Sequence, residues 1–358
     1  MPRSVFTPPT RRRPKRGPAD GATPYARRMA TYPVTEPYDH GLMPTGDGHQ
    51  VYWEVCGHPE GKPALVVHGG PGSGATDWWK QFFDPERYRV VLVDQRGCGR
   101  SIPNAADDVA ALRHNTTEHL VADFERLREE LGIDRWLLFG GSWGSTLALA
   151  YAVARPERVS GLVLWGVTTT RADDVAWLTH VMGQVYPAEF DELLAVLPEE
   201  QRDGNIPAAV HRLLVCGDSQ VEEAAARAWC TWEDRLSTLS GPVRRSARFE
   251  DARSRLGFAR LVTHYFGNYA FLPDEAIIGH LDRLDSIPTY LLRGRLDIAS
   301  SLRPAYEIAR RVASARLDVV EDDAHGPGGG SADRLVSVLD AFAAPTAEAA
   351  GQPTQLRT

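Results

Sequence analysis

The stretch Gly140-Gly141-Ser142-Trp143-Gly144 decides how the rest of this sequence is interpreted. An apolar run at 136–139 precedes it, and a helix-forming run rich in Ala and Leu follows at 145–152. A strand that breaks into the pattern Gly-x-Ser-x-Gly and then into a helix predicts a nucleophile elbow, in which the serine lies at a sharp turn. Such a turn strains the backbone of the serine and needs small residues two positions before and after it. The stretch therefore predicts a reactive hydroxyl on Ser142, at the N-terminus of a helix.

The regions around the elbow alternate between strands and helices. Helical spacing of apolar residues predicts a helix at 116–132, with Asn115 as its N-cap and Glu118 as its capping-box partner. Alternating or wholly apolar runs predict strands at 50–55, 64–67, 88–93, 161–167, 288–292 and 316–320. This alternation is typical of a mostly parallel sheet with helices on both faces.

Composition divides the chain into five segments. Residues 1–36 are basic and rich in proline, and 345–358 are small and polar, so both are predicted to be disordered extensions. Residues 37–171 and 286–344 carry the strand signals, whereas 172–285 consist almost wholly of helix and loop signals. A helical block between two halves of a sheet predicts an α/β core with an inserted helical cap.

Charge and cysteine usage argue against several classes of function. The 358-residue chain has a formal net charge of −7 and no apolar run near the roughly 20 residues that span a membrane. Its cysteines are widely separated, which favours a reducing compartment over a disulfide framework or a zinc site; they are Cys56, Cys98, Cys216 and Cys230. The first 30 residues carry eight Arg or Lys and one acidic residue, without an apolar signal segment. A solvated extension is favoured there over a nucleic-acid-binding arm.

The serine would need two partners, a base that takes its proton and a group that orients the base. Asp297 follows the predicted strand at 288–292, and His325 follows the one at 316–320. Alpha/beta hydrolases supply these groups in the order Ser, Asp, His, each after a strand. The sequence therefore predicts an α/β-hydrolase fold with the triad Ser142, Asp297 and His325. Asp322 and Asp323 are rival acids, but they lie too close to His325 in sequence to fit strand-end geometry well.

An acyl-transfer site also needs two backbone N–H donors for the oxyanion. One is predicted from the residue after the nucleophile, Trp143. The other is predicted from Gly70, in the segment His68-Gly69-Gly70-Pro71-Gly72 after an early strand. A phosphate-binding loop is the rival interpretation, but no Gly-Lys-Ser/Thr ending follows the glycines.

Four blocks give the sequence a specific resemblance. They are His68–Gly72, Asp94-Gln95-Arg96-Gly97-Cys98-Gly99-Arg100-Ser101, Asn115-Thr116-Thr117 and Gly140–Ser145, and together they resemble proline iminopeptidases from about residue 38 to 342. The resemblance implies a serine exopeptidase that releases N-terminal proline from small peptides. It also implies the triad named above, no metal or other cofactor, and a cytoplasmic location.

An aminopeptidase must bind a positively charged amino terminus, and the resemblance assigns this task to glutamates of the cap. Glu233 ends a Trp-x-x-Trp-Glu segment that matches the family pattern, and helical spacing would put its carboxylate beside Trp229. Val262 stands where the family usually has a second glutamate. Glu118 stands where the family often has Trp and is a candidate to compensate. Tyr265 and Phe266 are candidates for an apolar slot that would take the proline ring.

Three hypotheses follow. The leading one is a cytosolic serine aminopeptidase that acts on short peptides with N-terminal proline through a prolyl-enzyme intermediate, with no nucleic-acid or membrane partner. The missing second glutamate keeps open an esterase or amidase with another small substrate. A catalytically silent α/β-hydrolase scaffold is the third. The sequence carries no signal for an oligomeric state.

Overall fold

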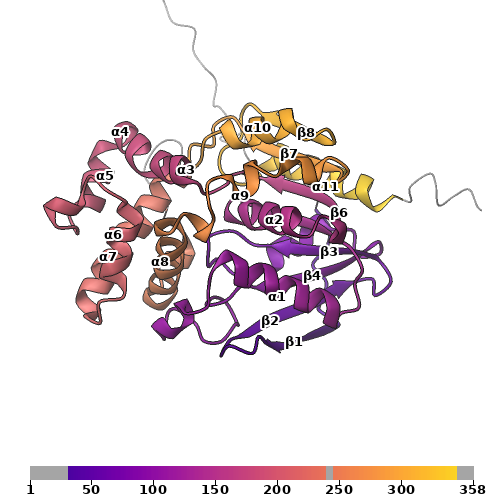
Figure 1. Cartoon of the computed structure of the whole chain (residues 1–358), viewed down its shortest axis with the longest axis horizontal. Helices are drawn as coiled ribbons and strands as arrows, with labels where there is room; N and C mark the ends of the chain where they lie inside the picture. The colour runs from indigo at the N-terminus through magenta and orange to yellow at the C-terminus, as the bar shows by residue number, and fades with distance from the viewer. Residues whose placement is uncertain (1–30, 239–244, 345–358) are drawn as a thin grey trace, which may run out of the picture.

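The central element is an eight-stranded sheet. The computed structural model describes residues 31–238 and 245–344, and the strands lie in the order β1-β2-β4-β3-β5-β6-β7-β8 (Figure 1). β1 and β2 pair antiparallel, β2 and β4 pair antiparallel, and all other neighbours are parallel. The strands span β1 Asp39–Pro44, β2 Gln50–Gly57, β3 Lys62–Val67, β4 Tyr88–Asp94, β5 Trp136–Gly141, β6 Val159–Trp165, β7 Thr289–Gly294 and β8 Ala315–Val320.

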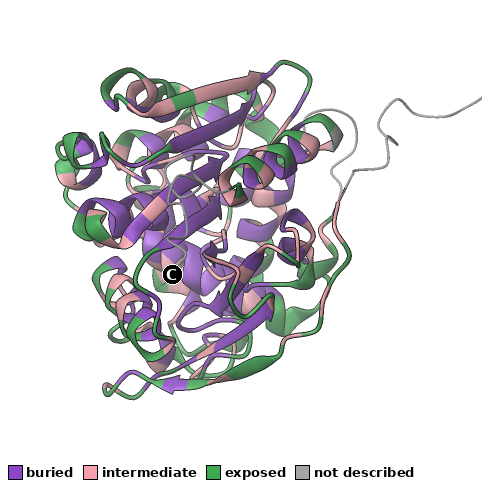
Figure 2. Cartoon of the chain, turned by 90° about the vertical axis from the view of Figure 1, so that its right-hand side faces the viewer, coloured by how far each residue is buried: buried purple, intermediate pink, exposed green. Residues whose placement is uncertain are grey.

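Helices cover both faces of this sheet. Successive residues of β3 point to opposite sides, so Leu65 packs into one apolar core and Val66 into the other. The first core lies under α1 (Thr117–Glu130), α2 (Trp143–Ala154) and α10 (Arg303–Arg311). The second lies under the 3₁₀ helix η1 (Asp77–Phe82) and α11 (Gly329–Ala343). Figure 2 shows the result, with buried strands between helices whose outer surfaces are exposed.

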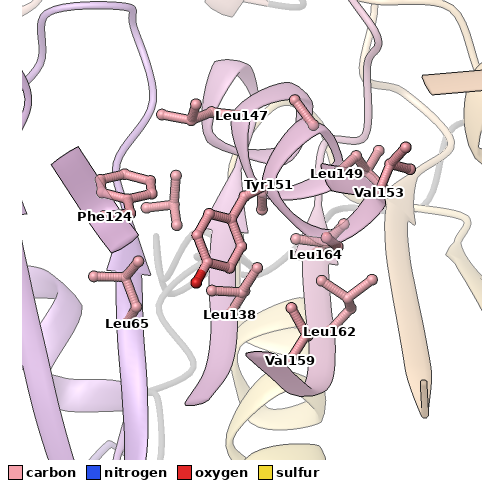
Figure 3. Packing of buried hydrophobic residues seen from close by; sticks show 14 of the residues in the cluster. Leu65, Phe124, Leu138, Leu147, Leu149, Tyr151, Val153, Val159, Leu162 and Leu164 are labelled. Atoms are coloured by element: carbon pink, nitrogen blue, oxygen red, sulfur yellow. The ribbon is translucent and has the colours of Figure 1, made fainter. Parts of the chain in front are cut away.

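The core under α1 and α2 is close-packed. Phe124 of α1 and Tyr151 of α2 lie 6.1 Å apart between ring centroids, and both are buried over the strands. Leu65 of β3, Leu138 of β5 and Leu147 of α2 fill the space around them (Figure 3). This contact fixes α2, and with it the elbow, on the sheet.

A helical segment separates two neighbouring strands. β6 and β7 pair with each other, although 123 residues lie between Trp165 and Thr289 in the sequence. Most helices of this segment gather at one side of the sheet, whereas the last one, Glu275–Ile278, packs against α2 over the sheet (Figure 1). They have an apolar core of their own, which includes Trp229, Trp232 and Val262. Their bounds are α3 Ala172–Ala176, α4 Met182–Val185, α5 Pro187–Leu194, α6 Ile206–Leu214, α7 Ser219–Ser237, α8 Ala252–Gly267 and α9 Glu275–Ile278.

The predicted fold class is confirmed, and each predicted strand is present. The predicted N-cap of α1 is wrong: Thr116 is the residue that flanks the helix, and Glu118 is exposed in its first turn. Asn115 does not cap the helix because it is fully buried and its amide bonds to groups outside α1. Its Nδ2 donates to the carbonyls of Arg96 and Ala111, and its Oδ1 accepts from the Tyr265 hydroxyl. The local Asn-x-x-Glu pattern was outweighed by these tertiary contacts.

Of the predicted terminal extensions, 1–36 and 345–358, residues 1–30 and 345–358 lie outside the described residues. Residues 31–36 are described and form no helix or strand, but Tyr32 packs against the second core and its hydroxyl donates to Asp340 at 2.9 Å. Among the described helices, none is both long enough and apolar enough to cross a membrane.

The elbow has the predicted strained geometry. Ser142 has φ 55° and ψ −127°, a conformation that L-residues rarely adopt. A Cβ built on Gly140 would lie 2.7 Å from the Gly144 carbonyl oxygen, and one on Gly144 would lie 2.0 Å from the Val67 carbonyl oxygen. Backbones of β3, β5 and α2 therefore approach so closely that only glycine fits at both positions.

We expect the substitution Gly144→Ala to lower the free energy of unfolding by about 3 kcal/mol or more, because backbone atoms of β3 and α2 must move apart. Gly204→Ala is the matched control, since a Cβ there meets nothing within 4 Å. It should change stability by less than about 0.5 kcal/mol. Urea unfolding followed by circular dichroism measures both, and equal stabilities would contradict the packing argument.

Candidate active site

The three residues of the predicted triad lie close together where parallel strands end. Ser142 follows β5, Asp297 follows β7 and His325 follows β8. Gly166, at the end of β6, marks their meeting point. A Cβ built there would lie 3.5 Å from the His325 Cε1, 3.5 Å from the Ser142 backbone nitrogen and 3.8 Å from the Asp297 Oδ2. Residues separated by 183 positions in sequence thus share one small space.

His325 and Asp297 are hydrogen-bonded. The His325 Nδ1 lies 3.0 Å from each Asp297 carboxylate oxygen, which leaves Nε2 free to face a substrate. Burial by itself would raise the pKa of Asp297, but the charge and hydrogen bond of His325, together with Arg293, outweigh it and lower that pKa. The rival acid Asp323 instead accepts the Ser331 backbone N–H at 3.1 Å.

A cavity of about 390 Å³ opens over these groups. Ser142 and His325 line it, as do Gly70 and Trp143, the two predicted oxyanion donors. Aromatic rings form much of the remaining wall: Trp78, Trp79, Trp165, Phe258 and Phe266. The cavity therefore combines aromatic walls with polar groups from the strand ends and from the helical segment.

Gln95 joins the two segments that carry the predicted oxyanion donors. Its Nε2 donates to the His68 carbonyl at 2.9 Å, and its Oε1 accepts the Trp143 indole N–H at 2.9 Å. Its backbone N–H donates to the His68 Nε2 at 3.0 Å. Burial lowers the pKa of His68, so a neutral ring accepts this bond. One amide side chain thereby fixes the spacing between Gly70 and Trp143.

Glu233 points into the same cavity from α7. Its Oε1 is buried and has no hydrogen-bond partner among the described residues. Burial raises the pKa of Glu233 above its ordinary value, against the opposing charges of Arg248 and His325. A buried carboxylate oxygen without a hydrogen bond is costly, and a cationic ligand would supply the missing contact.

Comparison with known proteins identifies the family. Residues 62–327 match the alpha/beta hydrolase fold family. A Streptomyces coelicolor protein named "Probable proline iminopeptidase" is 46% identical over 319 residues, covering 88% of this chain and 98% of the relative. The proline iminopeptidase of Neisseria gonorrhoeae is 42% identical over 294 residues, covering 81% of this chain and 91% of the relative. The chain belongs to the proline iminopeptidase family of α/β hydrolases.

Solved structures agree on the fold. The proline iminopeptidase of Mycobacterium smegmatis superposes with a TM-score of 0.53 at 21% identity, covering 85% of this chain and 97% of that one. An esterase from Exiguobacterium antarcticum gives a TM-score of 0.54 at 19% identity, covering 83% of this chain and 97% of that one. At such identities the likeness concerns the fold alone.

The block 94–101, which carries much of the resemblance to the proline iminopeptidase family, is held together by buried charges. The Asp94 carboxylate accepts the backbone N–H of Arg100 at 2.9 Å and its Nε at 2.7 Å. Arg96 makes a two-pronged contact with Asp123, at 2.6 and 2.7 Å. A Cβ on Gly99 would lie 2.4 Å from the Asp94 carboxylate, so that glycine is required. The block thus positions Gln95.

Of the other residues singled out in the sequence, one lines the cavity and the rest do not. Phe266 lines the cavity, as expected for a proline slot. Tyr265 is instead buried against Trp143, with 4.5 Å between ring centroids, and Glu118 is exposed on α1; neither lines the cavity. Val262 is buried in the core of the helical segment. The position of the family's second glutamate is therefore apolar in this chain.

Two charged residues of the cavity were missed by the sequence reasoning. Asp174 of α3 lines the cavity, and its Oδ2 accepts the Thr169 hydroxyl at 2.7 Å. Arg248 lies at the cavity edge, where its Nη1 donates to the Ser73 hydroxyl at 2.9 Å and its guanidinium covers the Phe258 ring at 4.5 Å. Neither residue lies in a distinctive sequence pattern. Each reaches the site only through the folding of the helical segment, which the sequence does not reveal.

Within residues 31–238 and 245–344, no three His, Cys, Asp or Glu side chains are grouped as a metal site requires.

We expect Gln95→Met to slow the labelling of Ser142 by a fluorophosphonate about tenfold or more, because the two segments that carry the N–H donors lose their link. Gln184→Met, at an exposed position of α4, is the control and should label at the native rate. Labelling is followed by mass spectrometry alongside a thermal melt. A folded Gln95→Met variant with native labelling would show that Gln95 does not organise the site.

Proposed function

We propose that this protein is a serine aminopeptidase that releases N-terminal proline from short peptides. The observation that carries the proposal is a buried, unpartnered carboxylate oxygen of Glu233 in the same cavity as Ser142 and His325. A nucleophile and an acceptor for a charged amino terminus in one cavity are what an exopeptidase needs. The relatives named as proline iminopeptidases, at 46% and 42% identity, support the same assignment.

In the proposed acylation step, the Ser142 Oγ attacks the carbonyl carbon of the prolyl residue while His325 Nε2 takes the hydroxyl proton. The carbonyl oxygen becomes an oxyanion, which the backbone N–H groups of Gly70 and Trp143 stabilise. Asp297 orients the imidazole and stabilises its positive charge. The C–N bond then breaks, and His325 gives its proton to the departing amine, so that the shortened peptide leaves.

In the proposed deacylation step, water attacks the prolyl ester while His325 takes one of its protons. The bond between the carbonyl carbon and the Ser142 oxygen breaks, and His325 returns the proton to that oxygen. Free proline leaves, and the enzyme is restored. No step requires a metal or another cofactor.

We assign recognition of the substrate amine to Glu233. The attraction between a carboxylate and an ammonium is larger in a partly desolvated cavity than in water. An ammonium next to Glu233 would also favour its ionised form, against the burial that raises its pKa. Aromatic side chains such as Phe266 and Phe258 would enclose the pyrrolidine ring.

The division into a core and a cap belongs to this proposal. Residues 172–285 would form the cap and residues 37–171 and 286–344 the core, so that the cap limits the cavity to small substrates. Leu178, Glu233 and Phe258 of this segment line the cavity, which supports that role. We also propose a cytoplasmic location, from the scattered free cysteines.

A second candidate function, an esterase or amidase with another small substrate, is favoured by the charges of the cavity. Val262 removes one expected carboxylate, and Arg248 faces the carboxylate that remains. A substrate ammonium at Glu233 would therefore share the cavity with the Arg248 cation. An uncharged acyl group would avoid this repulsion.

Hydrolysis of proline β-naphthylamide, alanine β-naphthylamide and an aryl acetate by the purified protein tests the two candidates. The aminopeptidase proposal expects the proline amide to be strongly preferred over the alanine amide. It also expects Ser142→Ala to lower kcat at least about a thousandfold while leaving the thermal melt unchanged. Turnover of the ester with no proline amide hydrolysis would favour the second candidate. Native turnover by Ser142→Ala would remove the serine mechanism.

We expect Glu233→Gln to lower kcat/KM for proline β-naphthylamide about tenfold or more, because a neutral amide attracts an ammonium far less than a carboxylate does. Hydrolysis of the uncharged aryl acetate should change much less. Glu118→Gln, on the exposed face of α1, is the control and should leave both rates unaltered. An equal loss on both substrates would mean that Glu233 supports the cavity and does not select the amine.

A further inference from the structure

Arg293 is a buried cation inside the sheet. It lies on β7, whose six residues are all buried, and its side chain is 1% exposed. Arginine is almost never buried this deeply unless it is paired. Its position, four residues before Asp297, puts it next to the proposed triad, yet the mechanism above assigns it no part.

The guanidinium holds the loop that carries Asp297. Its Nη1 lies 2.8 Å from the Asp297 Oδ2 and donates to the Ser300 hydroxyl at 2.7 Å. Its Nη2 donates to the Asp297 carbonyl at 3.3 Å and also to the Ser300 carbonyl. One rigid fork therefore binds both the carboxylate and the backbone on either side of the turn.

The Asp297 carboxylate is thus shared between two groups, Arg293 on one side and His325 on the other. The charged groups that face them from the helical segment are few. Asp174 of α3 faces Arg293, Glu233 of α7 faces His325, and Arg248 in turn faces Glu233. The permanent charge of Arg293 is the one in direct contact with the carboxylate.

A buried ion pair is weak evidence for a role in stability, because desolvation can cost more than the attraction returns. The effect of the Arg293–Asp297 pair on the neighbouring His325 imidazole follows directly from the charges. A carboxylate whose charge is partly offset by a guanidinium stabilises a protonated imidazole less than a free carboxylate would.

We infer that Arg293 is a positioning residue of the triad: it fixes the Asp297 carboxylate toward His325 and extends catalysis to more acidic solution by offsetting the charge of that carboxylate. The inference rests on the proposed roles of Ser142, Asp297 and His325, but it does not depend on which substrate the enzyme takes.

The test measures the rate at which a fluorophosphonate labels Ser142, between pH 4.5 and 9, in the native protein and in Arg293→Gln, Arg293→Met and Arg293→Lys. Labelling reports the triad without any peptide substrate. In the two neutral variants, the midpoint of the acid limb should rise by about one pH unit. Arg293→Lys keeps the charge and loses the fork, so its midpoint should stay near the native one while its maximal rate falls.

Circular dichroism melts accompany each variant. Lower rates with an unmoved acid limb in both neutral variants would overturn the inference, since a merely structural role changes amplitude alone. Failure of both neutral variants to fold, with Arg293→Lys folded, would also overturn it in favour of a structural role. An absence of proline β-naphthylamide hydrolysis, with native labelling intact, would count against the proposed function and leave this inference standing.

Discussion

The close approach of α2 to the sheet is the constraint on which the rest of the structure depends. The Gly144 backbone lies so near the Val67 carbonyl that a Cβ would stand 2.0 Å from the oxygen. This contact forces the chain to turn within one residue and holds Ser142 at φ 55°. The strain is maintained by packing, because α2 is buried from Trp143 to Val153 under α1 and over the strands. The proposed nucleophile, the first proposed N–H donor and the helix N-terminus are therefore fixed by a single contact between backbones.

Buried polar contacts then arrange the loops around that point. Gln95 joins the segment that carries Gly70 to the indole of Trp143, and the buried charges of the block 94–101 hold Gln95 in turn. On the other side of the site, Arg293 holds the loop of Asp297. These groups bond to one another inside the protein, where an unmatched polar atom is costly, and the Arg293 Nε is left without a partner among the described residues. The hydrogen bonds tie the loops at the strand ends to the sheet.

The helical segment supplies the features that distinguish one substrate from another. Its apolar core buries Val262 where the family usually has an acid, while Glu233 and Arg248 set the charge inside the cavity. Charge in such a space acts strongly, because aromatic walls exclude much of the water. In the proposed function, the residues at the strand ends carry out the reaction and the helical segment selects the substrate.

The sequence by itself determined which residues follow the strands and in what order: a serine at a sharp turn, then an aspartate and a histidine after later strands. It could do so because the close packing at an elbow restricts residue types locally, and because parallel strands bring their carboxyl ends to one edge. It also determined that residues 172–285 would be helical. It could not determine that Asn115 would bond to Tyr265 instead of capping α1, or that Asp174 and Arg248 would enter the cavity. Nor could it reveal that Arg293 would share the carboxylate of Asp297. Only the tertiary structure decided these points, because a buried polar side chain takes whichever partner the packing of distant segments brings within reach.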